Sequence, residues 1–356
     1  MRVLVATDGI GGLNSRAAGD CLGSGWLGQD VAVVPVGESG QGWLQSVADQ
    51  VGEEVSLVSL DTPIDADPVV AMMVAGGDTL AVAVVPTNEP APRGIDWTAS
   101  SAPLGEAVAR ALAEAGTPRT IAVDLTGLAN HDAGAGFLAA LGARADTTLT
   151  GGVAELGRLS RIDLTPVRQL LGDTELIGVV PADQRDDHLL GLRGITSRRG
   201  REAGLDTAPL LAADSALEQF VTAAAPEVAT EPGAGACGGL GWAIRALGGT
   251  LHTGLGHAAA RCDLPGLAGQ ADLIVTGCDR FDFATRGGGI VAGMAQFAEQ
   301  AMRPCLVLAG EVLIGLREMR TMGIEAAYPA WPDLPVTDPA AALTELSARV
   351  AQSWTF

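Results

Sequence analysis

The feature that most constrains this fold is a short apolar strand that leads through a polar loop and consecutive glycines into a helix. It is clearest in Ala271–Met294, where Leu273–Thr276 is predicted to be a buried strand. Three glycines, Gly287–Gly289, end the loop, and a helical pattern continues over Ile290–Met302. Ligands of open α/β sheets bind beyond the carboxyl ends of strands, and helix N-termini attract anions. The layout suits an anionic ligand, although an ordinary strand-to-helix turn has the same pattern.

The N-terminal part repeats this arrangement. Arg2–Thr7 is predicted to be a strand followed by Asp8 and a glycine-containing loop, and Val31–Val36 is a second strand before the glycine-rich turn 37–42. A strand, a helix and a strand in so short a span indicate parallel strands. Two further strands are expected at 304–309 and 326–329.

These patterns predict an α/β protein with two domains, because 356 residues exceed one typical core. Both chain ends are expected to form a Rossmann-type domain with a parallel, five-stranded, flavodoxin-like sheet. The middle of the chain would form an inserted second α/β domain. The predicted boundaries are residues 1–65 and 265–356 for the sheet domain and 66–264 for the inserted domain.

The charge balance restricts the partners. The net charge of −20 argues against nucleic acid, whose binding needs a basic face. All 22 basic residues are arginine, so any phosphate contact must come from arginine, a backbone amide or a metal ion. Four of these arginines lie within Arg193–Arg201, where a solvated helix face and an anion contact are both open interpretations.

Several classes of protein are excluded or disfavoured. No apolar run reaches the roughly 18 residues of a membrane-spanning helix, and the chain opens directly with a strand. We therefore expect a cytoplasmic protein without membrane association, and its oligomeric state is left open. The five cysteines are odd in number and lack CxxC spacing, which indicates reduced thiols.

Five stretches of the sequence carry the motifs of a known family in the family's order. They are ATDGIGGLNS at 6–15, ESGQGW at 38–43, TGLANHDAGAG at 126–136, GAGACGGLG at 233–241 and TGCDRFDFATRGGGIV at 276–291. These stretches resemble APDSFKGSLS, DGGEGT, GGSATNDGGAG, GAGAAGGLG and TGEGRLDxQTxxGKxP of the bacterial glycerate kinase family, the two-domain α/β type. The chain is similar to that family over nearly its whole length.

The resemblance implies ATP- and Mg²⁺-dependent phosphorylation of D-glycerate or a related small hydroxy acid, in a cleft between the two domains. The residues it places in catalysis are Asp8, Asp132, Arg280 and Asp282. Those it places in substrate or nucleotide binding are Glu38, Gly40, Gly42, Gly127, Gly134, Gly233, Gly235, Thr276, Gly277, Thr285, Arg286 and Gly288. Asp279 is a weaker candidate for holding the metal ion.

The departures from the family pattern leave a second hypothesis open. The two motif lysines are Gly11 and Gly289 here, and the motif glutamate is Cys278, with Asp279 one position later. Arg199 and Arg286 are the arginines that could replace the lysines, but arginine does not copy the compact ammonium of lysine. The alternative is a catalytically inactive pseudo-kinase of the same fold that binds a small ligand or a partner protein.

Overall fold

The computed structural model describes residues 1–60, 69–87, 94–331 and 336–355. These residues form two compact units. Unit 1 comprises Met1–Glu38, Gln45–Gly52 and Gly254–Phe356, and unit 2 comprises Ser39–Leu44 and Glu53–Thr253.

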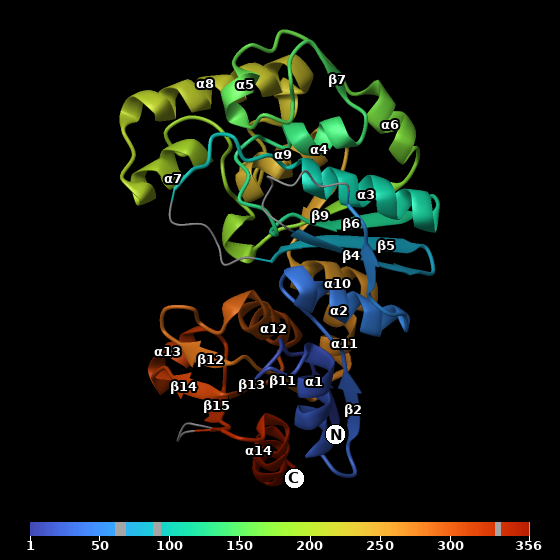
Figure 1. Ribbon diagram of the computed structural model, residues 1–356. Coiled ribbons are helices and arrows are strands. Elements are labelled where there is room, and N and C mark those ends of the chain that lie inside the picture. The colour runs from blue at the N-terminus through green and yellow to red at the C-terminus, as the bar shows by residue number, and fades with distance from the viewer. Residues whose placement is uncertain (61–68, 88–93, 332–335, 356) are drawn as a thin grey trace. The chain divides into compact units, whose positions relative to one another are not determined.

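Unit 1 is built around a five-stranded parallel sheet with the order β15-β13-β11-β1-β2 (Figure 1). The strands are β1 (Arg2–Val5), β2 (Asp30–Val33), β11 (Leu273–Thr276), β13 (Cys305–Ala309) and β15 (Ala326–Pro329). Strands from both chain ends therefore lie in one sheet. The predicted flavodoxin-like sheet is confirmed.

Helices cover both faces of this sheet because its strands are apolar on both sides. On β1, Val3 and Val5 belong to one buried cluster and Leu4 to another. The helices on the Val3 side are α1 (Ser15–Ser24) and α14 (Pro339–Trp354), and those on the Leu4 side are α10 (Gly254–Cys262), α11 (Leu264–Gln270) and α12 (Gly288–Ala301). The other elements are α13 (Leu316–Thr321) and the parallel pair β12 (Arg280–Asp282) and β14 (Glu311–Leu313).

Unit 2 contains a six-stranded mixed sheet with the order β10-β9-β6-β5-β4-β3. Its strands are β3 (Ser56–Val58), β4 (Val69–Gly76), β5 (Thr79–Pro86), β6 (Thr120–Asp124), β9 (Glu175–Val179) and β10 (Thr250–His252). The run from β5 to β10 is parallel, whereas β3, β4 and β5 pair antiparallel.

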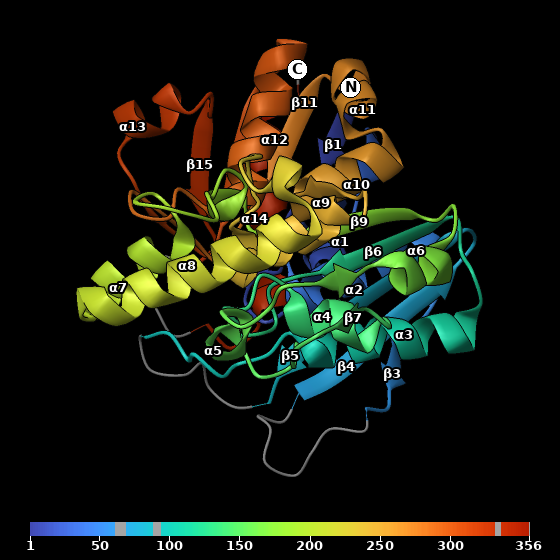
Figure 2. The same cartoon turned by 90° about the horizontal axis from the view of Figure 1, so that it is seen from above.

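The helices of unit 2 share one continuous apolar core with this sheet. They are α3 (Ala102–Ala115), α4 (Ala135–Ala140), α5 (Val153–Leu156), α6 (Thr165–Leu171), α7 (Ile195–Ala203), α8 (Thr207–Ala224) and α9 (Leu240–Ala246). The smaller elements are the pair β7 (Arg144–Ala145) and β8 (Ile162–Asp163) and the 3₁₀ turns Ala182–Gln184, Pro226–Val228 and Ala236–Gly239. Helix α7 lies against α8 (Figure 2). The side chain of Leu210 packs against Gly200 of α7, where an added Cβ would lie 2.3 Å from Cδ2 of Leu210.

The compact units divide the chain at different places from the predicted domain boundaries. The boundary predicted between 65 and 66 lies outside the described residues. Unit 2 ends at Thr253 rather than at 264, because α10 buries Leu255 and Ala258 in the core of the unit 1 sheet. Among the described residues, no helix has the length and apolar character that crossing a membrane requires.

Two helices begin earlier in the sequence than their apolar patterns predict. The helix α2 (Gly40–Val51) begins at Gly40 rather than near Trp43, and α12 begins at Gly288 rather than at Ile290. Glycine is a poor helix former, so these first turns need support from other segments. In both cases that support is a carboxylate that lies far away in the sequence.

Candidate functional site

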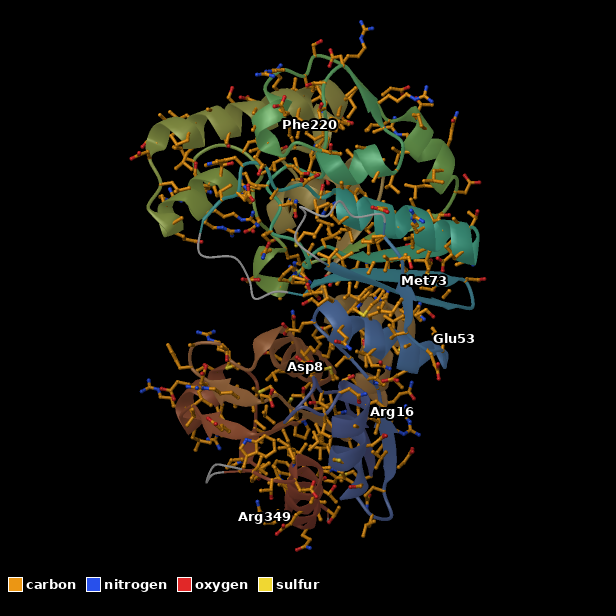
Figure 3. The ribbon with its side chains drawn as sticks, viewed as in Figure 1. Asp8, Arg16, Glu53, Met73, Phe220 and Arg349 are labelled. Carbon is orange, nitrogen blue, oxygen red and sulfur yellow. The ribbon has the colours of Figure 1, made fainter. Side chains whose placement is uncertain are left out.

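Asp8 lies directly beyond β1, in the half-buried loop of unit 1 that is labelled in Figure 3. Its Oδ1 accepts a hydrogen bond of 2.8 Å from the N–H of Gly9. Burial raises the pKa of Asp8 to about 6, and the nearby carboxylates of Glu38 and Asp279 raise it further, while the Gly9 N–H opposes the shift. Asp8 therefore exchanges its proton closer to neutral pH than an ordinary aspartate does, a property that recurs at functional sites.

Gly11 stands where the family pattern has its first lysine, and the structure leaves no room for a side chain there. Gly11 has φ +63°, and a Cβ atom would lie 2.7 Å from Cβ of Pro339 and 2.8 Å from Cη2 of Trp331. Its N–H instead donates to Oδ1 of Asp279. The next glycine, Gly12, has φ +81° and no atom within 4 Å of an added Cβ, so it can be approached closely.

The last residue of β11 and the first residue of the following loop are tightly packed. Thr276 is fully buried, and its Oγ1 has no hydrogen-bond partner among the described residues. An added Cβ on Gly277 would lie 2.3 Å from the carbonyl oxygen of Leu308, so this glycine permits close packing of backbones. Burial raises the pKa of the Cys278 thiol to about 12, with a further contribution from the Asp279 carboxylate, so Cys278 does not replace the motif glutamate as a charge.

Arg280 and Asp282 form an ion pair, with Nε and Oδ2 2.7 Å apart. Oδ1 of Asp282 also accepts from the N–H and the hydroxyl of Thr285, at 2.8 and 3.0 Å. These hydrogen bonds, with that from the Thr285 N–H as the largest cause, lower the pKa of Asp282. Asp282 is therefore ionised at neutral pH, and its hydrogen bonds shape the loop.

Glu38 caps the N-terminus of α12. Its Oε1 accepts a hydrogen bond of 3.0 Å from the N–H of Ile290, and an added Cβ on Gly288 would lie 2.7 Å from the same oxygen. A carboxylate thus occupies part of the N-terminus of α12, where the sequence predicted an anionic ligand. Arg286 is exposed, has φ +52°, and its guanidinium lies 5.8 Å from the ring centroid of Phe283.

Unit 2 contains a buried carboxylate, Asp124, that sequence reasoning missed. It ends β6, and its Oδ2 accepts from the N–H of Gly40 at 2.6 Å and from the Thr126 hydroxyl at 3.0 Å, while Oδ1 accepts from the Thr126 N–H at 3.1 Å. Burial raises the pKa of Asp124 to about 6, and these hydrogen bonds oppose the shift. The only signal in the sequence was an acid at a strand end. Asp124 fixes the start of α2, where Gly40 and Gly42 have open space around them.

Asp132, which we predicted to be catalytic, is buried, and both of its oxygens accept hydrogen bonds. Oδ2 accepts from the N–H and the hydroxyl of Ser101, both at 2.8 Å, and from the N–H of Gly136 at 3.1 Å. Oδ1 accepts from Asn130 Nδ2 and the N–H of Gly134. These bonds hold the loop between β6 and α4 against the start of α3.

Four predicted binding glycines serve backbone packing in unit 2. An added Cβ would lie 1.7 Å from the Val84 carbonyl oxygen at Gly127 and 2.5 Å from Cβ of Ala243 at Gly134. The corresponding distances are 2.7 Å to the Arg185 carbonyl oxygen at Gly233 and 2.2 Å to that of His188 at Gly235. These glycines let the segments around 126–136 and 233–241 pack closely.

The fold and these loops define a two-unit α/β protein with a flavodoxin-like sheet and carboxylates at the carboxyl ends of β1 and β6. Its sequence matches the model of the glycerate kinase family over residues 3–355. The chain belongs to the glycerate kinase family.

Curated relatives cover nearly the whole chain. An uncharacterized protein of Mycobacterium bovis is 30% identical, over 99% of this chain and 91% of its own length. The glycerate kinase of Bacillus subtilis is 27% identical over 99% of this chain and 96% of its own length, and that of Halalkalibacterium halodurans is 29% identical over 90% and 89%. A crystal structure provisionally assigned as glycerate kinase 2 from Salmonella typhimurium LT2 shares the fold. Its TM-score is 0.80 and its sequence identity 22%, with 99% of this chain and 98% of that chain covered.

Proposed function

We propose that this chain transfers a phosphoryl group from ATP to D-glycerate or a related small hydroxy acid. Family membership supports a kinase-type reaction, and the state of Asp8 is the observation that carries the proposal. A half-buried carboxylate with a pKa of about 6 is ionised at neutral pH and still basic enough to accept a hydroxyl proton. Asp8 would accept the proton of the acceptor hydroxyl as that oxygen attacks the phosphoryl group.

The oxygen donors of unit 1 fit a nucleotide-bound Mg²⁺. Asp279 is exposed, and while Oδ1 bonds to Gly11, its Oδ2 has no hydrogen bond among the described residues. Within the same residues, no three His, Cys, Asp or Glu side chains converge into a metal-binding group. Mg²⁺ bound with a nucleotide takes one or two carboxylates, phosphate oxygens and waters, so Asp279 suffices as its protein ligand. The ion would neutralise charge on the transferred group.

Backbone amides and arginine supply the remaining interactions of the proposed reaction. Within unit 1, Gly12 has space around it for close approach of a ligand. Within unit 2, Gly40 and Gly42 have such space. Arg280 is half-exposed beside Asp282 and would contact a phosphate or carboxylate through its remaining N–H groups. We propose Thr285, Arg286 and Gly288 as further contacts, with Glu38, Thr276 and Gly277 shaping the loops that present them.

Two observations favour the second candidate function, that of an inactive kinase-like protein that binds a small ligand. Gly11 is enclosed by Trp331 and Pro339, so no cation occupies the first lysine position. Glu38 caps α12, where a negative charge disfavours phosphate. Either feature reduces the stabilisation of a phosphoryl-transfer transition state, which depends on positioned charge.

An ADP-release assay with D-glycerate, ATP and Mg²⁺ separates the two functions. The kinase proposal expects turnover that Asp8→Asn abolishes and that requires all three components. Absence of turnover together with a ligand-dependent rise in melting temperature would establish the binding protein instead. Absence of both responses would remove both candidates.

A further inference from the structure

Arg199 is a mostly buried arginine without an acidic partner. No carboxylate of the described residues lies within ion-pairing distance of it, although the chain has 42 acidic and only 22 basic residues. Burial lowers the pKa of Arg199, and the charges of Asp187 and Glu202, neither of them in an ion pair with it, oppose the shift. Its neighbour Arg198, in contrast, forms a bidentate ion pair with Asp187. An uncompensated buried cation is costly, and it therefore indicates a site for an anion.

The guanidinium of Arg199 is held from one side only. Nη1 donates to the carbonyl oxygen of Asn130 at 2.9 Å and lies 3.3 Å from Nδ1 of His131. Nε and Nη2 have no hydrogen-bond partner among the described residues, and neither is closed off from solvent. The edge formed by Nε and Nη2 is the pair of donors that binds a carboxylate through two parallel hydrogen bonds.

His131 fixes this orientation while remaining neutral. It is fully buried, and its Nε2 lies 2.9 Å from the hydroxyl oxygen of Thr196, which is also buried. Since Nδ1 accepts from Arg199, the hydrogen-bond network assigns the ring proton to Nε2. Burial, with the charge of Arg199 as a second cause, lowers the pKa of His131 to about 3. Among Arg199, His131 and Thr196, only Arg199 carries a positive charge. A single positive charge suits one carboxylate better than a triphosphate.

The alternative arginine, Arg286, lacks these properties. It is exposed and its guanidinium already lies over the Phe283 ring, so water compensates its charge. An exposed, hydrated arginine needs no ligand to explain it, whereas the mostly buried Arg199 without an ion pair does.

We propose that Arg199, held in position by Asn130 and His131, forms a carboxylate-binding site within unit 2. The inference rests on the proposed function for the identity of the ligand, a small hydroxy acid. It predicts that recognition depends on the carboxylate, so D-glycerate binds and its neutral amide does not. Phosphate of the nucleotide is the other oxyanion that this edge would accept, and separate titrations distinguish the two.

The test titrates the full-length protein calorimetrically with D-glycerate, with D-glyceramide and with Mg-ATP, each alone. Arg199→Gln and Arg199→Lys should weaken D-glycerate binding about 10- to 100-fold, the effect of losing charge-assisted hydrogen bonds, and leave Mg-ATP within about twofold. The matched control is Arg201→Gln, which removes one exposed arginine from the same helix and should change neither affinity. Equal melting temperatures for the wild type and Arg199→Lys exclude a folding defect.

Three results would overturn the inference. They are an unchanged affinity for D-glycerate in both Arg199 variants, a loss confined to Mg-ATP, and equal binding of D-glyceramide by the wild type. A wild type that binds D-glycerate through Arg199 but shows no phosphoryl transfer would refute the kinase reaction and leave this site intact. A wild type that binds no D-glycerate would refute the site.

Discussion

Asp279 accepts a hydrogen bond from the backbone N–H of Gly11, which joins the loop after β11 to the loop after β1. Both residues mark departures from the family pattern: Gly11 stands where a lysine is expected, and Asp279 lies one position after the expected acid. The two changes are structurally coupled, because the shifted carboxylate bonds to the amide of the residue that lost its side chain. The loop is thereby held in place without the lysine.

Replacing Gly11 by alanine should destabilise the protein more than the same change at Gly12. Both glycines have positive φ, so each alanine incurs backbone strain of about 1–2 kcal/mol. At Gly11 the added Cβ also collides with Pro339 and Trp331, which adds about 1–3 kcal/mol. Urea unfolding of the two variants measures the difference. Equal losses of stability would show that Pro339 and Trp331 do not enclose Gly11 tightly.

Removing the carboxylate of Glu38 should loosen the first turn of α12. Glu38→Ala leaves the Ile290 N–H without its acceptor and should lower the free energy of unfolding by about 1 kcal/mol, the usual value of a helix cap. Hydrogen exchange at the Ile290 amide should accelerate in this variant. Glu38→Gln keeps a neutral acceptor, so its exchange rate at Ile290 should lie between those of the wild type and Glu38→Ala. Unchanged exchange at Ile290 would contradict the cap.

The strands and most helices could be predicted from the sequence because apolar residues recur at strand and helix spacing. The starts of α2 and α12 could not, because their first turns are glycine-rich. The start of α2 is stabilised by Asp124, which lies 84 residues from the Gly40 amide that it accepts from. The start of α12 is stabilised by Glu38, which lies 252 residues from the Ile290 amide. Such partners are brought together only by the folded chain.

The candidate site was only partly predictable for the same reason. Asp8 could be identified from its place after the first strand, but the cause of its raised pKa includes Asp279, at the other end of the chain. Asp132 looks like a catalytic acid in sequence, yet its oxygens are occupied by Ser101, Asn130 and the amides of its own loop. Asp124 belongs to no sequence motif, and only its burial in the folded protein identifies it as an unusual carboxylate.

Asp124 should make the protein less stable as pH rises from about 4 to 7. Its pKa is raised from 3.8 to about 6 in the folded state, so the folded protein binds the proton more tightly than the unfolded chain in this range. The contribution of Asp124 to the free energy of unfolding therefore falls with rising pH, by about 3 kcal/mol for a pKa shift of about two units. The wild-type free energy of unfolding minus that of Asp124→Asn should fall by this amount between pH 4 and 7.

A control of opposite sign tests that interpretation of Asp124. Hydrogen bonds from Thr165, with that from its side chain as the largest cause, lower the pKa of Asp163. Asp163 thus stabilises the folded state above its unfolded pKa, and this contribution is lost as pH falls. The same difference measured for Asp163→Asn should rise with pH. A difference for Asp124→Asn that does not depend on pH would contradict the raised pKa.

The acid limb of the pH–rate profile of the kinase reaction should report the ionisation of Asp8. If Asp8 accepts the hydroxyl proton, kcat/KM should rise with pH through about 6, the pKa of Asp8, and level off above it. Asp8→Asn should lower kcat by at least about 100-fold and remove this rise. The Glu38 carboxylate contributes to the raised pKa, so Glu38→Gln should lower the pKa of Asp8 and move the midpoint of the acid limb to lower pH. A midpoint that stays in place in Glu38→Gln, or an acid limb that persists in Asp8→Asn, would assign the proton transfer to a different group.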